Sequence, residues 1–533
     1  MIVSRVRKVK GRFNFRFSRF RLCESEDGKS IIGKGDLKIV GMNPYNAESL
    51  DFFVGERQCK TVIENIKSTK WGCRCTVRLT MGKEEIFTLP IHNVLKVRFV
   101  DREEGTTQAG VMFDGRLPFY VAKRTRYIKD EKTGTVAFFR QNAGKGTTFT
   151  VRHENVTDSP VKQSKLFVAW LLSKSAFWID PALVYEKNCH HYEESGRVLY
   201  EALIDRGCRK VNFVLDKETA RGIDIEKRYR KGIVYQHSLR HYLLFFRCKR
   251  FLGTESMAHA LELRCQNIFV QRKLKKKDNR FVFLQHGVMY MVSLDSPQRS
   301  SFKREALKGD YYVVASSDLE ARHFIDSAGF KREEIIVSGL PKFDRSFLNQ
   351  GADRILVMPT WRMWEFNEMR YNPQGTAYVK MIERIVDAIP DELKDRVFVA
   401  NHPLFNRELF KASVDGSCAS YDELLRDVSL LITDYSSIAY DSFYRGANVV
   451  FYWEEMEECM EHYGGDTRLM LSEDLAFGPC CYCQEDLRKA VGSLYRSPQK
   501  RLYRQRFGRI VEHHDGKNTE RLIAELRRLD IIR

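Results

Sequence analysis

Long uninterrupted hydrophobic runs are missing from this sequence. A helix that crosses a bilayer needs about 18 to 20 apolar residues in a row, and no such run occurs. The nearest candidate, residues 166–179 (LFVAWLLSKSAFWI), is shorter and contains Lys174. We therefore expect no transmembrane helix, and this segment predicts a buried or interfacial helix. The first residues also lack the apolar core of a secretory signal, so we expect no export.

Regular cysteine spacings are missing as well. The 13 cysteines are odd in number and scattered over 533 residues, which argues against a disulfide framework and fits a reducing cytosol. Cys73-Arg-Cys75 lacks the C-x-x-C spacing of a zinc site, and Cys480-Cys481-Tyr-Cys483 has no second C-x-x-C pair to complete one. No acidic D-x-D cluster accompanies the expected strand ends either. We therefore expect ordinary thiols, no metal site and no cofactor.

The composition is that of a folded and basic protein. Hydrophobic residues make up 43% of the chain and charged residues 30%, which excludes disorder for most of its length. The 89 Lys and Arg against 70 Asp and Glu give a formal charge of +19. The basic residues follow no recognisable nucleic-acid-binding motif, so we expect no nucleic-acid partner. A chain of this length is typical of about two to four domains.

The N-terminal segment, residues 1–29, contains no acidic residue before Glu24. Eight basic residues and four phenylalanines are interleaved there: Arg5, Arg7, Lys8, Lys10, Arg12, Arg16, Arg19 and Arg21, with Phe13, Phe15, Phe17 and Phe20. Basic and aromatic side chains together suit contact with an anionic membrane surface. A solvated, poorly ordered tail is the other interpretation of the same pattern.

The rest of the chain divides into a β-rich part and an α/β part. Residues 30–157 contain short alternating segments such as CTVRLTM and TTFTVRH, which predict a small β-rich domain. From about residue 158, apolar runs alternate with helical patterns, which predicts parallel α/β layers. The runs expected to be strands are VNFVL, FVFLQHG, YYVVAS, EIIVSGL, ILVMPTW, VFVANHP, LLITDYSS and VVFYW. Ser317 and Glu320 are spaced as a helix capping box. We place one Rossmann-like domain at 158–348 and a second, with a C-terminal helix, at 349–533.

Polar groups follow four of the expected strands, where open parallel sheets bind their ligands. These groups are His286-Gly287, Pro359-Thr360-Trp361-Arg362, Asn401-His402-Pro403 and Asp434-Tyr435-Ser436-Ser437. Each taken alone is a weak signal. Four of them within one α/β region predict a ligand site.

Each group has a functional and a structural interpretation. Ser436 and Ser437 begin a helix, whose free N–H groups favour an anion such as pyrophosphate, or they simply cap that helix. Arg362 either pairs with a phosphate through two bonds or forms a salt bridge. His286 can take a proton from an alcohol, and His402 can donate to phosphate or assist a leaving group. A structural histidine is the alternative at both positions.

These strand ends belong to a longer series of motifs. In chain order they are HG at 286–287, G-x-P-K-x-D at 339–344, PTWR at 359–362, HP at 402–403 and TDYSS at 433–437. The order of the motifs and the segment LLITDYSSIAYDSFYRGANVVFY resemble the CDP-glycerol glycerophosphotransferase family, which includes teichoic-acid primases and polymerases. The resemblance covers roughly residues 183–520.

The resemblance implies a GT-B fold, in which two Rossmann-like domains face a cleft that holds CDP-glycerol. An acceptor hydroxyl attacks the β-phosphorus and CMP leaves. The family's two histidines fall on His286 and His402, and we expect His286 to be the general base. The substrate contacts implied by the motifs are Gln285, Gly287, Val288, Met289, Lys342, Thr360, Trp361, Arg362, Ala400, Asn401, Ser436, Ser437 and Asp441. Family members act at the cytoplasmic face of the membrane on an acceptor linked to a lipid.

The chain departs from the family pattern at two motifs. The segment after His286-Gly287 reads Val-Met-Tyr-Met instead of beginning with threonine, and Lys342 stands where arginine is usual. The leading hypothesis is transfer of glycerol or ribitol phosphate from a CDP donor to a lipid-linked acceptor, in synthesis of a teichoic-acid-like or capsule polymer. The alternative enzyme is a GT-B glycosyltransferase that uses sugar nucleotides for a cell-surface polysaccharide. A basic protein that binds membranes or nucleic acid without catalysis is the third hypothesis.

Overall fold

The computed structural model describes most of the chain in two compact units. The described residues are 7–8, 13–42, 47, 49–89, 91–101, 105–113, 127–141, 147–296, 302–365, 368–369, 372–400 and 421–532. Unit 1 comprises Met1–Phe167 and Arg264–Gln271, and unit 2 comprises Val168–Leu263 and Arg272–Arg533. No helix within the described ranges is both long and apolar enough to cross a bilayer.

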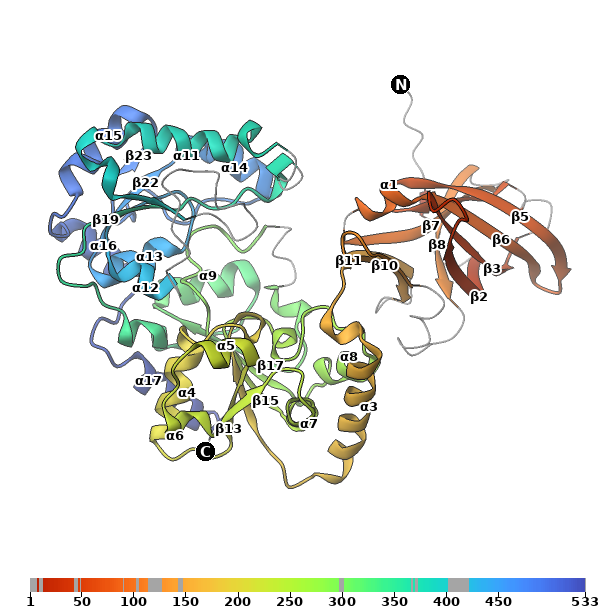
Figure 1. Ribbon diagram of the computed structural model, residues 1–533, viewed down its shortest axis with the longest axis horizontal. Coiled ribbons are helices and arrows are strands. Elements are labelled where there is room, and N and C mark those ends of the chain that lie inside the picture. Colours follow the sequence, from red (N-terminus) through yellow and green to blue (C-terminus); the bar gives the residue numbers. More distant parts are fainter. Residues whose placement is uncertain are drawn as a thin grey trace. The chain divides into compact units, whose positions relative to one another are not determined.

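Unit 1 contains a closed β-barrel (Figure 1). Seven strands follow one another around it in the order β8-β2-β3-β6-β5-β4-β7, and pairing of β7 with β8 closes the ring. Strands β11, β10 and β9 extend the sheet from β7, and β1 pairs with β8. The strands are β1 (Arg7–Lys8), β2 (Asn14–Glu24), β3 (Ser30–Val40), β4 (Asp51–Val54), β5 (Arg57–Thr69), β6 (Gly72–Gly82), β7 (His92–Asp101), β8 (Gly105–Phe113), β9 (Tyr127–Asp130), β10 (Thr135–Gln141) and β11 (Thr147–His153). The β-rich region expected from the sequence is therefore present, but it is a barrel that begins before residue 30.

Three of the four phenylalanines of the N-terminal segment lie inside this barrel. Phe15, Phe17 and Phe20 are all at most 1% exposed. The register of β2 against β3 shifts after Ser18, and Arg19 has a φ of 50°; such a bulge places side chains three residues apart on the same face. Their burial removes these rings from any membrane contact, so the structure does not support that interpretation of residues 13–24.

Glycines in β3 make room for the ring of Phe20. A Cβ at Gly33 would lie 2.5 Å from Phe20 Cζ, and one at Gly35 would lie 2.8 Å from Phe20 Cδ2. Real Cβ atoms do not approach other atoms this closely. An alanine at either position would overpack the core, which costs stability. The Gly-Lys-Gly sequence of β3 thus fits the aromatic core that β2 supplies.

Unit 2 begins with a seven-stranded parallel sheet in the order β14-β13-β12-β15-β16-β17-β18. The chain builds β12 to β14 in one direction and β15 to β18 in the other, so the order reverses between β12 and β15. The strands are β12 (Ala182–Tyr185), β13 (Val211–Leu215), β14 (Ile233–Tyr235), β15 (Arg250–Gly253), β16 (Arg280–Phe283), β17 (Asp310–Ala315) and β18 (Ile335–Val337). The main helices are α4 (Ser195–Asp205), α7 (Leu239–Arg247) and α9 (Asp318–Ala328). Crevices at such reversals are the usual ligand sites of α/β sheets.

A second parallel sheet of five strands has the order β20-β19-β21-β22-β23. Its order reverses between β19 and β21. The strands are β19 (Arg354–Val357), β20 (Val397–Val399), β21 (Val428–Thr433), β22 (Asn448–Tyr452) and β23 (Cys480–Cys481). Its helices are α11 (Ala377–Ala388), α12 (Tyr421–Arg426), α13 (Ile438–Arg445), α14 (Met456–Tyr463), α15 (Gln484–Leu494) and α16 (Arg501–Ile510). All eight strands expected from the sequence are confirmed, because strands buried on both faces are continuous apolar runs.

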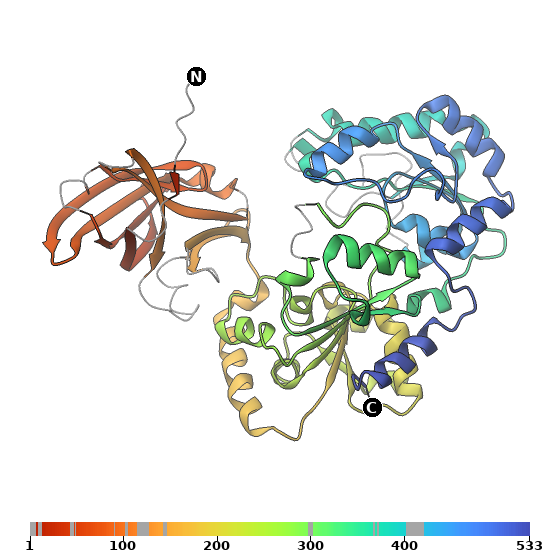
Figure 2. The ribbon, with the colours of Figure 1, turned by 180° about the vertical axis from the view of Figure 1, so that it is seen from behind.

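The last helix, α17 (Asn518–Arg528), returns to the first sheet of unit 2. It packs against α4 and the short helical turn Pro341–Arg345, and Figures 1 and 2 show it beside α4 from both sides. The backbone N–H groups of Asn518 and Thr519 donate to Asp344 at 3.0 and 2.7 Å. The sequence places this helix with the second Rossmann-like domain, whereas its packing joins it to the first.

Candidate active site

His286 lies in the turn that follows β16. The preceding residue, Gln285, is fully buried, has a φ of 57° and donates to the backbone oxygen of Val314. This left-handed conformation is uncommon outside glycine. It ends the strand abruptly and leaves the His286 side chain 48% exposed. The adjacent Val288 is buried in the core and Met289 is half-buried.

The loop after β15 orients the imidazole of His286. Nδ1 lies 3.4 Å from the backbone oxygen of Thr254 and 3.8 Å from Glu255 Oε1. A proton on Nδ1 donates to this backbone oxygen and leaves Nε2 as the basic nitrogen. Because β15 borders the reversal point of the first sheet, His286 stands next to the position where such sheets bind ligands.

The N-terminus of α13 lies against the His286 turn. A Cβ at Gly287 would come within 2.6 Å of Ser437 Oγ. Tyr440 of the same helix donates to the backbone oxygen of Tyr290 at 2.9 Å. Ser436 and Ser437 are half-buried at the first turn, where unpaired N–H groups and the helix dipole favour an anion. The two sheets of unit 2 thus place His286 and the N-terminus of α13 side by side.

Lys342 joins the two halves of this site. Its Nζ lies 2.6 Å from Asp441 Oδ1 and donates to the backbone oxygen of His286 at 2.6 Å. The side chains of Lys342 and Asp441 are 11% and 7% exposed. In this structure Lys342 forms an ion pair that holds α13 to the His286 turn, and its expected contact with the substrate stays a prediction.

The arginine of the PTWR motif, Arg362, supports the loop after β19, and its guanidinium is not exposed to solvent. Arg362 is 1% exposed, and its Nη1 donates to Asp434 Oδ2 at 2.7 Å and to Thr360 O at 2.9 Å. Thr360 N donates to Asp434 Oδ1 at 2.7 Å. Burial opposes the charge of Arg362, but Asp434 outweighs it and raises the pKa of the guanidinium. The structure thus shows the salt bridge that was one of the two interpretations of Arg362, and its contact with a substrate phosphate stays a prediction. Thr360 and Trp361 are half-buried.

Sequence reasoning did not single out three carboxylates in this region, of which Glu186 and Glu320 are fully buried and Glu194 is half-buried. Glu186 accepts from three backbone N–H groups between residues 193 and 197, and burial raises its pKa to about 6. Burial and the neighbouring Glu186 raise the pKa of Glu194 to about 7, and the charge of Lys342 opposes this rise. Glu320 accepts from Met289 N at 2.7 Å and Ser316 N at 2.6 Å. Only its capping-box position marks Glu320 in the sequence, and Ser317 does accept from its N–H.

Two expected site residues, Asn401 and His402, lie outside the described residues. Strand β20 ends at Val399, and Ala400 is buried with its N–H donating to Val357 O at 3.0 Å. The role of His402 thus remains a prediction. Within the described ranges, no group of three or more His, Cys, Asp or Glu side chains is placed to hold a metal ion.

The family model described as CDP-Glycerol:Poly(glycerophosphate) glycerophosphotransferase matches residues 179–527. The chain belongs to this family. The matched segment begins just before β12 and ends in α17, so it contains both parallel sheets and every site residue described above. The barrel of unit 1 precedes it.

Two curated relatives from Bacillus subtilis (strain 168) are similar to the chain. The minor teichoic acid biosynthesis protein GgaB is 23% identical over 368 residues, which cover 63% of this chain and 39% of GgaB. The teichoic acid glycerol-phosphate primase is 24% identical over 235 residues, which cover 41% of this chain and 58% of the primase. The chain thus spans less than two thirds of the length of either relative.

A solved structure of the wall teichoic acid polymerase TagF has a similar fold. It superposes with a TM-score of 0.50 at 16% identity and covers 70% of this chain and 96% of the TagF chain. At this identity the likeness concerns the fold alone. It agrees with the mixed α/β architecture of unit 2.

Gly287→Ala is expected to lower the rate of CMP release by about 100-fold. The Cβ of the alanine would displace Ser437 and shift α13. CMP release from CDP-glycerol measures the effect. The matched control is Gly492→Ala in α15, where a Cβ would meet no atom within 4 Å. Equal rates in the two variants would show that the close approach of Gly287 to Ser437 is not needed.

The stability of the chain is expected to fall with rising pH because of Glu320. Burial raises the pKa of Glu320 to about 7 from its ordinary 4.5. The folded protein therefore holds this proton between pH 4.5 and 7 while the unfolded chain releases it, so raising the pH favours unfolding. Urea unfolding at pH 5 and pH 8 should show a smaller loss of stability for Glu320→Gln than for the unchanged protein. An identical loss in both would contradict this role.

Proposed function

We propose that this chain transfers glycerol phosphate, or the related ribitol phosphate, from a CDP-activated donor to a hydroxyl of a lipid-linked acceptor. CMP is the second product, and the polymer is teichoic-acid-like or capsular. Membership of the glycerophosphotransferase family supports the reaction class. One TagF structure comes from a variant soaked with CDPG, which supports the donor. The single structural observation that carries the proposal is the placement of His286 against the N-terminus of α13.

The proposed mechanism uses the two halves of the site for the two reactants. His286 Nε2 takes the proton of the acceptor hydroxyl, and the oxygen attacks the β-phosphorus of the donor. The bond between that phosphorus and the bridging oxygen breaks, and the oxygen leaves with CMP. The N–H groups at Ser436 and Ser437 stabilise charge on the phosphates. His402 is proposed to act on the phosphate side, and the donor would lie between the two sheets as in a GT-B fold.

Lys342 and Asp441 contribute by holding these halves together. Their ion pair is almost fully buried and reaches from the first sheet to α13. Catalytic groups must be held close to the productive geometry for the rate to be high. We therefore assign both residues a positioning role in the proposed reaction.

The donor is tested by measuring CMP release from CDP-glycerol and from CDP-ribitol, with a lipid-linked acceptor present. We expect release from at least one of them, and comparison of the two rates identifies the alditol. UDP-sugars and CMP-sugars serve as controls. Turnover of a sugar nucleotide with neither CDP-alditol consumed would favour the glycosyltransferase alternative instead.

A further inference from the structure

The outer face of four neighbouring barrel strands carries basic side chains in an ordered pattern. Strands β2, β3, β6 and β5 are adjacent in the sheet of unit 1 (Figure 1). Successive side chains of a strand point to opposite faces, so every second residue faces outward. Residues directly opposite each other on paired strands share a face and lie about 5 Å apart. The register of the strands therefore shows which outward side chains are neighbours.

Two rows of basic residues run across these strands. The first row spans all four strands, the second spans β2, β3 and β6, and the members of each row lie directly opposite one another. All of them are exposed. We call them the basic rows: Arg16, Lys38, Arg74 and Lys67 in the first, and Arg21, Lys34 and Arg78 in the second.

The basic rows concentrate like charges that the barrel itself does not neutralise. Like charges on directly opposite residues destabilise a sheet. Lys34, Lys38, Arg74 and Arg78, in the two central strands, form no ion pair with a carboxylate of the described residues. A bound anion would offset this repulsion.

Polar side chains form a third row between the two basic rows. Asp36 lies opposite both Ser18 and Thr76, and Thr76 also lies opposite Glu64. Thr76 donates to Asp36 Oδ1 at 3.5 Å. Hydroxyl and carboxylate groups of this kind form hydrogen bonds with the hydroxyl groups of a ligand. The face thus offers cations on both sides of a row that suits a polyol.

The spacing of the rows requires an extended ligand. Lys34 and Lys38 are four residues apart in β3, which separates the two basic rows by about 14 Å at ~3.4 Å per residue. The first row crosses four strands, and neighbouring strands lie about 4.8 Å apart, so this row is also about 14 Å long. One phosphate group cannot contact both rows, whereas a chain with phosphates at intervals can.

We propose that the basic rows bind a linear poly(alditol phosphate) chain. Its phosphodiester groups contact the lysines and arginines, and its alditol hydroxyls contact the polar row between them. The choice of this polymer rests on the proposed function, because such a chain is the product of the proposed reaction. A polymer bound to the barrel stays with the enzyme between successive transfers.

The composition of the face favours this polymer over nucleic acid, which is also a linear phosphodiester. Proteins that bind single-stranded nucleic acid stack its bases on aromatic side chains. The three rows contain no aromatic residue.

Fluorescence anisotropy of labelled poly(glycerol phosphate) with the full chain, in the absence of donor, tests the proposal. We expect binding that weakens at least tenfold between about 50 and 200 mM salt, because several ionic contacts are involved. Lys38→Glu with Arg74→Glu should weaken binding about tenfold or more, as should Lys34→Glu with Arg78→Glu. Thermal melting shows whether each variant is folded. The two pairs belong to different rows, so either variant carries the test if the other does not fold.

The matched control is Lys227→Glu with Lys231→Glu in unit 2. Both lysines are exposed, in and just after α6 (Lys227–Arg230), and the double change alters the net charge by the same amount. Binding by this variant should equal that of the unchanged chain.

CMP release separates this proposal from the proposed function. With an acceptor that carries a single alditol unit, both row variants should release CMP at the rate of the unchanged chain, and their polymers should be shorter. Failure of the unchanged chain to release CMP would refute the proposed function, while polymer binding would still be measured.

Absence of polymer binding by the unchanged chain would overturn the proposal. Full binding by both row variants, or an equal loss in the Lys227 and Lys231 control, would overturn it as well. Single-stranded RNA and vesicles that contain phosphatidylglycerol serve as competitors. If either binds the face and poly(glycerol phosphate) does not displace it, the face belongs to a different partner and the proposal is wrong.

Discussion

His286→Ala is expected to lower the rate of CMP release from CDP-glycerol by about 10²- to 10⁴-fold, the usual range for loss of a general base. The imidazole is half exposed, and Thr254 and Glu255 orient its Nδ1. No other imidazole within the described residues is placed against the N-terminus of α13. The alanine side chain cannot take the proton of the acceptor.

The exposed His153 at the end of β11 provides the matched control. His153→Ala should leave the rate unchanged, because this residue belongs to the barrel of unit 1. Donor binding by His286→Ala, measured by calorimetry with CDP-glycerol, should change far less than the rate. A rate within threefold of that of the unchanged chain would remove His286 from the mechanism.

Asp434→Ala is expected to lower the free energy of unfolding by about 3–5 kcal/mol, because it leaves the buried guanidinium of Arg362 without its main partner. Asp434 also accepts from Thr360 N, and its backbone oxygen accepts from Trp453 Nε1 at 3.2 Å. Strands β19 and β21 flank the reversal point of the second sheet. Asp434 follows β21, and its carboxylate binds Thr360 and Arg362 in the loop after β19. Urea unfolding followed by tryptophan fluorescence measures the loss.

A surface ion pair of similar length separates the effect of burial from that of charge. Asp353 lies 2.5 Å from Arg396, and these side chains are 31% and 54% exposed. Asp353→Ala should cost less than about 1 kcal/mol, since exposed pairs contribute little. Adding Arg362→Met to Asp434→Ala should recover part of the lost stability. A cost below about 1 kcal/mol for Asp434→Ala alone would contradict a structural role for the buried pair.

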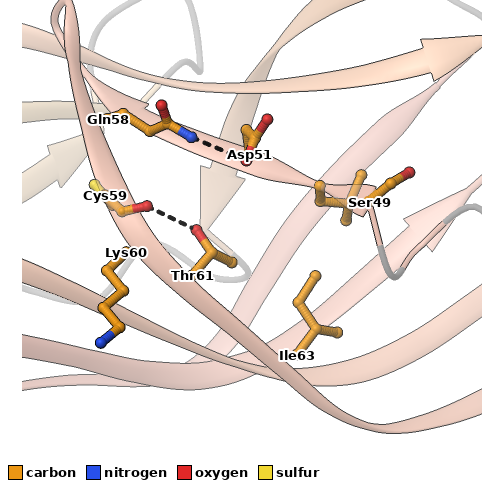
Figure 3. A pocket seen from close by; sticks show the side chains of 8 residues that line it. Ser49, Asp51, Gln58, Cys59, Lys60, Thr61 and Ile63 are labelled. Carbon is orange, nitrogen blue, oxygen red and sulfur yellow. Dashed lines mark hydrogen bonds between the residues drawn. The ribbon is translucent and has the colours of Figure 1, made fainter.

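The barrel of unit 1 also contains a polar pocket of about 580 Å³ (Figure 3). Asp51, Gln58, Lys60 and Thr61 lie on it, and Gln58 donates to Asp51 at 3.1 Å. Thr61 donates to the backbone oxygen of Cys59 at 3.1 Å. The family match begins after the barrel, and the proposed reaction assigns no role to the pocket.

The sequence predicted the parallel sheets well because their strands are short apolar runs with polar residues at their ends. The same logic located His286 and the two serines before α13, Ser436 and Ser437, at strand ends. It did not find Glu186 or Glu194, because their burial depends on loops that only the folded chain brings together. The charge of Arg362 indicated a phosphate contact, but its partner Asp434 lies 72 residues away along the chain.

In the N-terminal segment the residue pattern is clear, but it fits two different structures. Alternation of phenylalanine with arginine in residues 13–21 is also the pattern of a strand with one buried face. Pairing with β3 decides between a strand and a membrane contact, and the bulge at Arg19 places Phe20 inside. A pattern of two residue types thus predicts an amphipathic element, but its apolar face can turn inward or outward.

The central claim, attack of an acceptor hydroxyl on the β-phosphorus, is tested most directly with CDP-glycerol labelled at that phosphorus. The label should appear on the lipid-linked acceptor, with unlabelled CMP released in equal amount. Label retained in CDP would show that the glycerol moves without its phosphate, and label in free glycerol phosphate would show hydrolysis. Either of these outcomes in place of labelled acceptor would contradict the proposed transfer.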